Sequence, residues 1–376
     1  MSTSAYSVYE TTEQAWTAMY KAIQNATSSI YWEVYIFVDD KVGTRFFDLL
    51  EQKALEGLEV KLIIDYWGSF ALSRKRVNQL KQKGIDVLLF QERKPRYKTF
   101  WKRFSIRTHQ KVLIIDQALG FIGGVNIQKD MNDWLDLHMC VRGTVVKSLL
   151  RSFARLYLLS GGAKENIRHI LWSARFRPGL EQQNMKMIYD QPRGKYSRTR
   201  KRYLEALRKA SQRVILFSPY YFLDAQFLKA LWEAKKRGVR VDLLIPLRTD
   251  LRVATYAAYA WFAVLKKAGV RIHVLKKMMH GKGLIVDEDW AMIGSSNIDH
   301  PSFYHNYEAN IHLKDKRIVR KIKRIALRWM DSAKSLDDLR WHKRSLWHKF
   351  KERLAIKGYT YWFNIEDQAT DKTDQK

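Results

Sequence analysis

The residues best suited to chemistry occur twice in this sequence, in the same order and with the same spacing. Each copy has the pattern H-x-K-x4-D, and each is followed by an asparagine, Asn126 or Asn297, 17 residues after its histidine (126 − 109 and 297 − 280). Residue frequencies give one such match by chance in roughly one chain in twenty, so two matching copies indicate a function. The six motif residues, taken as the catalytic set, are His109, Lys111, Asp116, His280, Lys282 and Asp287.

These residue types predict chemistry on a phosphodiester. Lys111 and Lys282 carry positive charge, and Asn126 and Asn297 are amide donors, so all four can hold the non-bridging oxygens of one phosphate. Glycines beside the asparagines let the backbone approach the anion, and we place Ser296 in the same phosphate-binding or orienting group.

Two histidines at one phosphate allow a displacement in two steps. One attacks phosphorus and forms a phosphohistidine, while the other protonates the leaving alkoxide and then deprotonates the acceptor. Asp136 and Glu308 follow the motif histidines by 27 and 28 residues, and each can bond the far nitrogen of a histidine and fix its tautomer. Asp116 lies an odd number of positions from His109, which suits a structural or orienting role better than phosphate contact. We expect no metal and no other cofactor, because lysines supply the positive charge.

The chain around the motifs also repeats, which predicts an α/β fold in two halves. Helix-like stretches such as 44–55 and 224–236 separate strand-like segments, and this alternation is typical of α/β sheets. We expect a strand to start at each motif histidine, with His and Lys projecting from the same face. The apolar residues that follow predict a central strand buried on both faces. The strand-like segments are 29–37, 57–65 and 84–90, matched by 214–222, 238–246 and 269–275. We expect domains at 1–185 and 186–330 and a basic amphipathic helical tail at 331–376.

The paired motif resembles the hallmark of the phospholipase D superfamily, and its flanks resemble bacterial cardiolipin synthases. The flanks are EVYIF at 33–37, DYWGS at 65–69, WLDLH at 134–138, SPYYF at 218–222 and GSSNID at 294–299. The resemblance covers about residues 5 to 330. It implies two pseudo-twofold-related α/β domains with mixed central sheets that share one active site. It also implies ping-pong phosphatidyl transfer, with His109 as the nucleophile and His280 as the acid and base.

Composition predicts a polyanionic partner. The 376 residues carry a net charge of 68 − 38 = +30, and 46% are hydrophobic, which excludes wholesale disorder.

Residues 91–108 mix seven basic residues with aromatics, which suits a membrane interface, single-stranded nucleic acid or a solvated loop. In the tail, an apolar helical stripe predicts either membrane binding or packing on the body. The stripe is Leu336, Leu339, Leu346, Trp347, Phe350 and Leu354. The segment 254–265 is either a buried helix or an acyl site.

The sequence contains no apolar run of the ~18 residues that a membrane span needs, and its first residues lack a signal-peptide pattern. We therefore expect a peripheral protein on the cytoplasmic side of the cell membrane, with anionic phospholipids rather than nucleic acid as partners. The sequence does not determine the oligomeric state. The leading hypothesis is an enzyme that joins two phosphatidylglycerols into cardiolipin and releases glycerol. The alternatives are hydrolysis to phosphatidic acid and a nuclease of the same superfamily.

Overall fold

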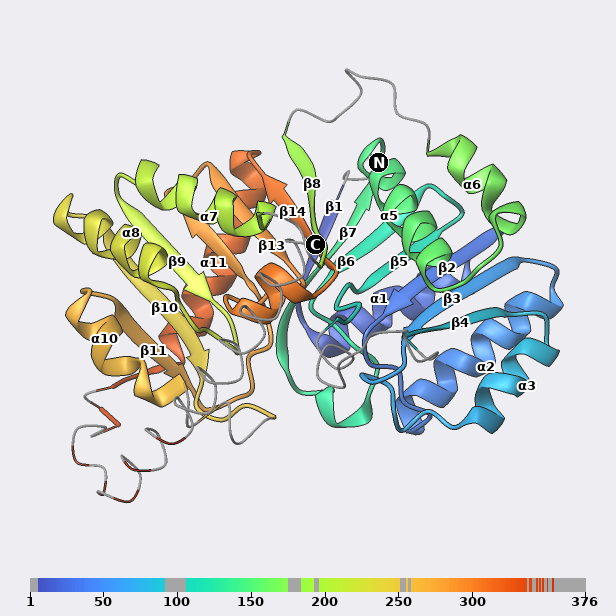
Figure 1. Ribbon diagram of the computed structural model, residues 1–376, viewed down its shortest axis with the longest axis horizontal. Coiled ribbons are helices and arrows are strands. Elements are labelled where there is room, and N and C mark those ends of the chain that lie inside the picture. Colours follow the sequence, from blue (N-terminus) through green and yellow to red (C-terminus); the bar gives the residue numbers. More distant parts are fainter. Residues whose placement is uncertain are drawn as a thin grey trace, which may run out of the picture.

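The computed structural model describes residues 6–91, 106–174, 184–192, 196–250 and 258–336, together with the single positions 255, 338, 339, 343, 345, 347, 350 and 354. Two sheets dominate it, one from each half of the chain, and they lie side by side in Figure 1, with the first half on the right. Strands β13 and β14 of the second sheet contact β6 of the first, so the sheets meet in the middle of the molecule.

The first half holds a seven-stranded mixed sheet in the order β1-β7-β6-β5-β2-β3-β4. Strands β2, β3 and β4 are parallel, and the other neighbours are antiparallel. The strands are β1 (Tyr6–Thr11), β2 (Ser29–Val34), β3 (Glu59–Asp65), β4 (Asp86–Phe90), β5 (Val112–Ile115), β6 (Leu119–Gly123) and β7 (Leu135–Arg142). The helices are α1 (Thr12–Gln24), α2 (Lys41–Leu55), α3 (Arg74–Gln82), η1 (Lys129–Met131), α5 (Val145–Leu159), η2 (Lys164–Ile167) and α6 (Arg168–Ser173).

The second half repeats this plan in an eight-stranded sheet, ordered β15-β11-β10-β9-β12-β13-β14-β8. Strands β9, β10 and β11 are parallel, and the other neighbours are antiparallel. The strands are β8 (Met185–Asp190), β9 (Arg213–Phe217), β10 (Arg240–Pro246), β11 (Arg271–Leu275), β12 (Gly283–Val286), β13 (Trp290–Gly294), β14 (Glu308–Leu313) and β15 (Lys334–Ser335). The helices are α7 (Arg198–Lys209), α8 (Ala225–Lys236), α10 (Phe262–Lys267), η3 (Pro301–His305) and α11 (Lys316–Asp331).

The predicted α/β fold with two mixed central sheets is confirmed, and β5 and β12, which follow the two motifs, are central strands buried along their whole length. The expected strand starts at His109 and His280 are wrong, because the strands begin three residues later, at Val112 and Gly283. The predicted helix at 224–236 is present as α8 and begins after Asp224, whose carboxylate accepts the backbone N–H of Phe227.

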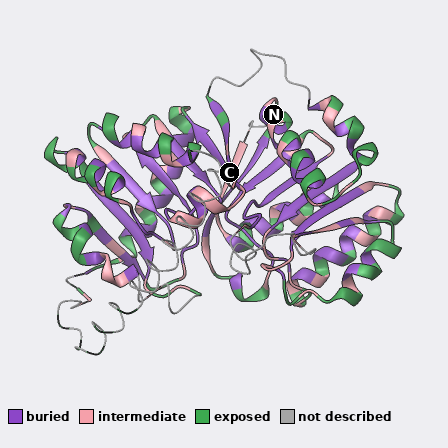
Figure 2. Cartoon of the chain, in the orientation of Figure 1, coloured by how far each residue is buried: buried purple, intermediate pink, exposed green. Residues whose placement is uncertain are grey.

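Three hydrophobic clusters hold the molecule together. One lies on the outer face of each sheet, under α1, α2 and α3 in the first half and under α7, α8 and α10 in the second. The third is shared by both halves and joins Ile114 of β5 and Phe153 of α5 to Ile285 of β12 and Ile322 of α11. Figure 2 shows the buried strands of both sheets running toward this common centre. The shared cluster fixes the two motif strands relative to one another.

The structure describes parts of the segments for which the sequence left two or more interpretations open. In 254–265, Ala258, Phe262 and Leu265 are buried in the second half's outer cluster, as the buried-helix alternative predicts. The tail begins by packing on the body, because β15 pairs with β11 and Leu336 is buried. Further along, Trp347, Phe350 and Leu354 are exposed. Most of 91–108 and the chain after 354 lie outside the described residues. The domain limits at 185 and 330 stay a prediction.

None of the helices in the described ranges combines the length and the apolar character of a membrane span.

Candidate active site

Each motif histidine is anchored through its backbone to the opposite half of the chain. The N–H of His109 donates to the carbonyl of Tyr307 at 2.9 Å, and the N–H of Tyr307 donates to Arg107 at 2.8 Å. In the same way, the N–H of His280 donates to the carbonyl of Leu135 at 2.7 Å. These bridges explain why the regular strands start only after the histidines, since the preceding backbone is paired across the two halves.

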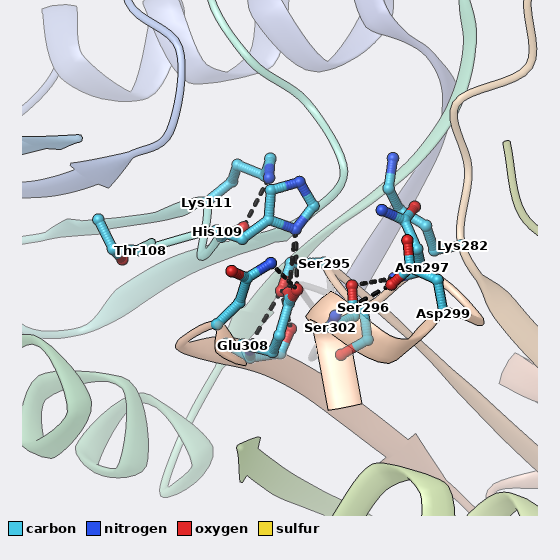
Figure 3. A network of polar contacts seen from close by, with 12 residues as sticks. Thr108, His109, Lys111, Lys282, Ser295, Ser296, Asn297, Asp299, Ser302 and Glu308 are labelled. Carbon is cyan, nitrogen blue, oxygen red and sulfur yellow. Dashed lines mark hydrogen bonds and ion pairs between the residues drawn. The ribbon is translucent and has the colours of Figure 1, made fainter. Parts of the chain in front are cut away.

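The side chains of the histidines are paired in the same crossed manner. His109 Nδ1 lies 3.0 and 3.1 Å from the two carboxylate oxygens of Glu308, and His280 Nδ1 lies 2.9 Å from Asp136 Oδ2. An ionised carboxylate can only accept, so Nδ1 donates in each pair. The lone pair is then on Nε2, the nitrogen needed for attack on phosphorus or for proton transfer. Figure 3 shows the His109–Glu308 pair.

Burial and charge set the protonation of the first pair. Burial lowers the pKa of His109 to about 4, and the positive charge of Lys111 adds to this, while Glu308 opposes it. Burial acts to raise the pKa of Glu308, but its contact with His109 outweighs this, and the pKa of Glu308 falls below its usual value. His109 is therefore a neutral imidazole beside an ionised carboxylate, the state that a nucleophile requires.

The second pair differs in its surroundings. Burial and the charge of Lys282 both lower the pKa of His280, and Asp136 opposes them. Asp136 itself has a lowered pKa: burial acts to raise it, but the contact with His280 prevails. A bound phosphodiester adds a negative charge at this point and favours the protonated form of His280.

The two motif lysines are buried cations at the same centre. Lys111 Nζ donates to the carbonyl of His109 at 2.6 Å, and Lys282 Nζ donates to the carbonyl of His280. Burial, and then repulsion from Lys282, lower the pKa of Lys111, while burial lowers the pKa of Lys282 to about 8. The charge of Lys282 acts unfavourably on Lys111, and an anion bound between the two lysines would relieve this repulsion. Within the described residues, no three His, Cys, Asp or Glu side chains gather as metal ligands would.

The polar residues after the motifs have different surroundings. Asn297 is nearly buried, its N–H donates to Ser302 Oγ at 3.1 Å, and its side-chain oxygen has no hydrogen-bond partner among the described residues. Asn126 Oδ1 accepts the N–H of Ile36 at 3.2 Å. Ser296 Oγ accepts from Asn310 at 2.7 Å, so it is tied to β14. The side chain of Asn297 therefore has an unused polar group beside the motif, whereas Asn126 and Ser296 also support the local fold.

Asp116 and Asp287, placed in the catalytic set from the sequence, are not part of this centre. The carboxylate of Asp116 accepts the backbone N–H groups of residues 27, 28 and 29 at 2.8 to 3.1 Å. Asp287 accepts the corresponding groups of residues 211, 212 and 213 at 2.8 to 3.0 Å. Each aspartate therefore fixes the loop before β2 or β9 to the end of its motif strand. Asp116 and Asp287 therefore leave the catalytic set that the motif suggested. The structural role of Asp116 agrees with the expectation from its odd spacing to His109.

Several residues near the centre were not singled out for a role from the sequence. Ser295 Oγ donates to Glu308 and Thr108 Oγ1 donates to the buried Glu33, whose pKa burial raises to about 8. The ring of Tyr35 meets that of His109 edge-on at 4.9 Å, and Lys111 Nζ lies 5.1 Å from the centre of the Tyr35 ring. Glu33 and Tyr35 fall in the flanking segment EVYIF at 33–37, and Ser295 falls in GSSNID at 294–299. The family-like flanks were therefore the available signal for these three residues.

Comparisons with known proteins identify relatives over most of the chain. The family model for "Cardiolipin synthase, PLD-like domain" matches residues 19–156 and 203–329, one motif in each segment. The chain is 31% identical over 348 residues to cardiolipin synthase 2 of Bacillus anthracis, covering 90% of this chain and 67% of that protein. It is 28% identical over 360 residues to cardiolipin synthase of Staphylococcus aureus strain N315, covering 93% and 72%.

Solved structures give the same fold at low sequence identity. Phosphatidylserine synthase of Haemophilus influenzae Rd KW20 aligns with a TM-score of 0.72 at 12% identity, over 99% of this chain and 96% of that one. Polyphosphate kinase of Porphyromonas gingivalis aligns at 0.56 and 13% identity, over 85% and 46%. The chain belongs to the phospholipase D superfamily. Within it, the chain belongs to the family of cardiolipin synthase PLD-like domains, and it is an enzyme of the phosphatidyltransferase class.

Proposed function

We propose that this protein joins two phosphatidylglycerol molecules into cardiolipin and releases glycerol, through a phosphohistidine intermediate. The observation that carries the proposal is the crossed pair of buried histidine–carboxylate contacts beside two buried lysines. The names of the relatives supply the substrate class. The same site chemistry serves donor and acceptor in turn, which suits a reaction in which both are the same lipid.

In the first step, His109 Nε2 forms a bond to the phosphorus of the donor, and the bond from phosphorus to the glycerol headgroup oxygen breaks. That oxygen takes the proton from Nε2 of protonated His280 and leaves as glycerol. Lys111 and Lys282 offset the charge on the non-bridging oxygens. The Nδ1 proton of His109 stays bonded to Glu308, whose negative charge stabilises the cationic phosphohistidine that has formed.

In the second step, the acceptor phosphatidylglycerol presents a headgroup hydroxyl to the phosphohistidine. Its oxygen bonds to phosphorus while its proton passes to Nε2 of His280, and the bond from phosphorus to His109 breaks. His109 is again neutral and His280 is again protonated, so the enzyme returns to its starting state. Asp136 keeps the Nδ1 proton of His280 in place throughout, so that one nitrogen acts first as acid and then as base.

We further propose that the enzyme acts from the cytoplasmic surface of the membrane on anionic phospholipids. Phe70 supports contact with a lipid surface: it is 81% exposed on the loop after β3. Asp65 holds that loop beside the motif, since its carboxylate accepts the N–H groups of Gly68 at 2.8 Å and of Thr108 at 3.0 Å. An exposed aromatic tip next to a phosphodiester site suits a lipid interface.

The test is incubation of purified protein with labelled phosphatidylglycerol in liposomes, followed by mass spectrometry of the lipid products. Cardiolipin together with free glycerol is the expected result. Phosphatidic acid as the main product would replace the proposal with hydrolysis, in which water takes the place of the acceptor in the same second step. Cleavage of DNA without any lipid product would overturn both.

A further inference from the structure

A cavity of about 460 Å³ is lined by residues of α5 from the first half and by residues at the end of β8 and the start of α7 from the second half. Figure 1 labels these three elements. The cavity lies next to the first motif without belonging to the reaction centre. Gln110, between His109 and Lys111, lines it, and the Gln110 side chain accepts a hydrogen bond at 3.0 Å from Ser152 on α5. His109, one residue earlier, contacts Glu308 instead, as alternation along an extended segment predicts.

The lining of this cavity is cationic. It contains Arg151 and Arg155 from the first half and Arg198 from the second, and Asp190 is the one acidic residue among the described residues that line it. The Asp190 carboxylate is already occupied, because it accepts the backbone N–H of Arg198 at 2.6 Å and of Thr199 at 3.2 Å. Neither Arg155 nor Arg198 forms an ion pair with a described carboxylate. Guanidinium groups gathered in this way create a site for an anion.

The remaining lining residues indicate the shape of that anion. Ser148, Ser152 and Gln110 supply neutral polar groups, whereas Leu156 and the half-exposed Leu159 supply apolar surface. A volume of about 460 Å³ lies within the range of small-molecule sites, roughly 300–1,000 Å³. The combination fits a phosphate group that carries a small organic substituent better than it fits a bare halide.

We propose that this cavity is a second phosphate site, which binds a phosphomonoester or phosphodiester separately from the reaction centre. An anion here would join Arg155 of the first half to Arg198 of the second and so stabilise the contact between the halves. It would also reach the chemistry through Tyr307, which lines the cavity while its carbonyl accepts the N–H of His109. The source of the phosphate is either a lipid headgroup or a soluble phosphate ester.

The first test compares thermal unfolding in sodium phosphate and in sodium chloride at equal ionic strength. The cavity variant Arg155→Gln/Arg198→Gln is paired with a control, Lys147→Gln/Lys201→Gln. The control loses the same charge from exposed positions on the same two helices, outside the cavity lining. Phosphate should raise the Tm of the wild type and the control by about 2 °C or more, and should raise that of the cavity variant clearly less. Any binding at the reaction centre is common to all three proteins, so the difference measures the cavity alone.

The second test separates the two sources and does not depend on lipid turnover. Co-sedimentation with phosphatidylglycerol vesicles should be weaker for the cavity variant than for the control if a lipid headgroup is the occupant. Equal vesicle binding together with the reduced thermal shift would assign the cavity to a soluble phosphate ester, for which glycerol 3-phosphate is the next probe. Equal thermal shifts and equal vesicle binding in the cavity variant and the control would overturn the proposal.

Discussion

Replacing each active-site carboxylate by its amide tests the crossed pairing, because the structure assigns Glu308 to His109 and Asp136 to His280. Glu308→Gln and Asp136→Asn keep the shape of the side chain and remove its charge. A buried hydrogen bond to a charged group contributes roughly 1.5–3 kcal/mol, which corresponds to a loss of roughly 10- to 150-fold in rate. His109→Ala and His280→Ala should each lose several orders of magnitude.

The decisive assay uses a substrate whose leaving group needs no proton, such as the p-nitrophenyl ester of phosphatidic acid, with release of p-nitrophenolate as the signal. Formation of the phosphohistidine then no longer needs the acid. The first-turnover burst should therefore recover toward the wild-type rate in His280→Ala and in Asp136→Asn. It should stay slow in His109→Ala and in Glu308→Gln, because both act on the nucleophile.

The four variants should behave as two pairs, His109→Ala with Glu308→Gln and His280→Ala with Asp136→Asn. Each pair contains one residue from each half of the chain. If Glu308→Gln recovered together with His280→Ala, the crossed assignment would be refuted, since that carboxylate would then serve the acid. If the two pairs kept their members but exchanged behaviour, the pairing would stand and the roles of His109 and His280 would be reversed. Acid-quench trapping of the phosphorylated residue checks the same point directly, and we expect phosphate on His109.

Three further outcomes follow from the site. Activity should survive EDTA, because Lys111 and Lys282 supply the positive charge; loss that magnesium or zinc restores would contradict this. In kcat/KM, the acidic limb should lie well below pH 6.5, since attack needs neutral His109 and its pKa is about 4. The alkaline limb should report the acid His280, whose pKa burial and Lys282 lower in the free enzyme, and it should lie at higher pH in kcat, because a bound phosphodiester favours protonated His280. Asp116→Ala should lower the Tm while kcat of the folded fraction stays within a few-fold of wild type, and a loss of kcat without a change in Tm would argue for a direct role.

Sequence reasoning reached the fold and most of the centre because the chain repeats. The alternation of strand-like and helix-like segments predicted the α/β fold, and the apolar runs predicted the central motif strands. The odd spacing between His109 and Asp116 predicted the structural role of Asp116. The strand starts did not follow, since the backbone of His109 bonds to the other half rather than within its own sheet. The sequence spacing also could not show which carboxylate serves which histidine. Asp136 and Glu308 stand at nearly equal offsets from their own histidines, and only the docking of the halves exchanges them.

The crossed pairing gathers the charged residues of both motifs at one buried centre, and the net charge of this centre changes when substrate binds. Two lysines and the two paired carboxylates meet at a buried centre, and the buried Asp65 and Asp299 also act on those lysines. A phosphodiester brings one negative charge, and an uncompensated charge in a buried site is costly. Protonation of His280 compensates this charge, because the pKa of His109 is held low and Glu308 is already paired. The incoming lipid would therefore itself raise the pKa of His280, and the acid needed to release glycerol would be protonated when a donor phosphate is in place.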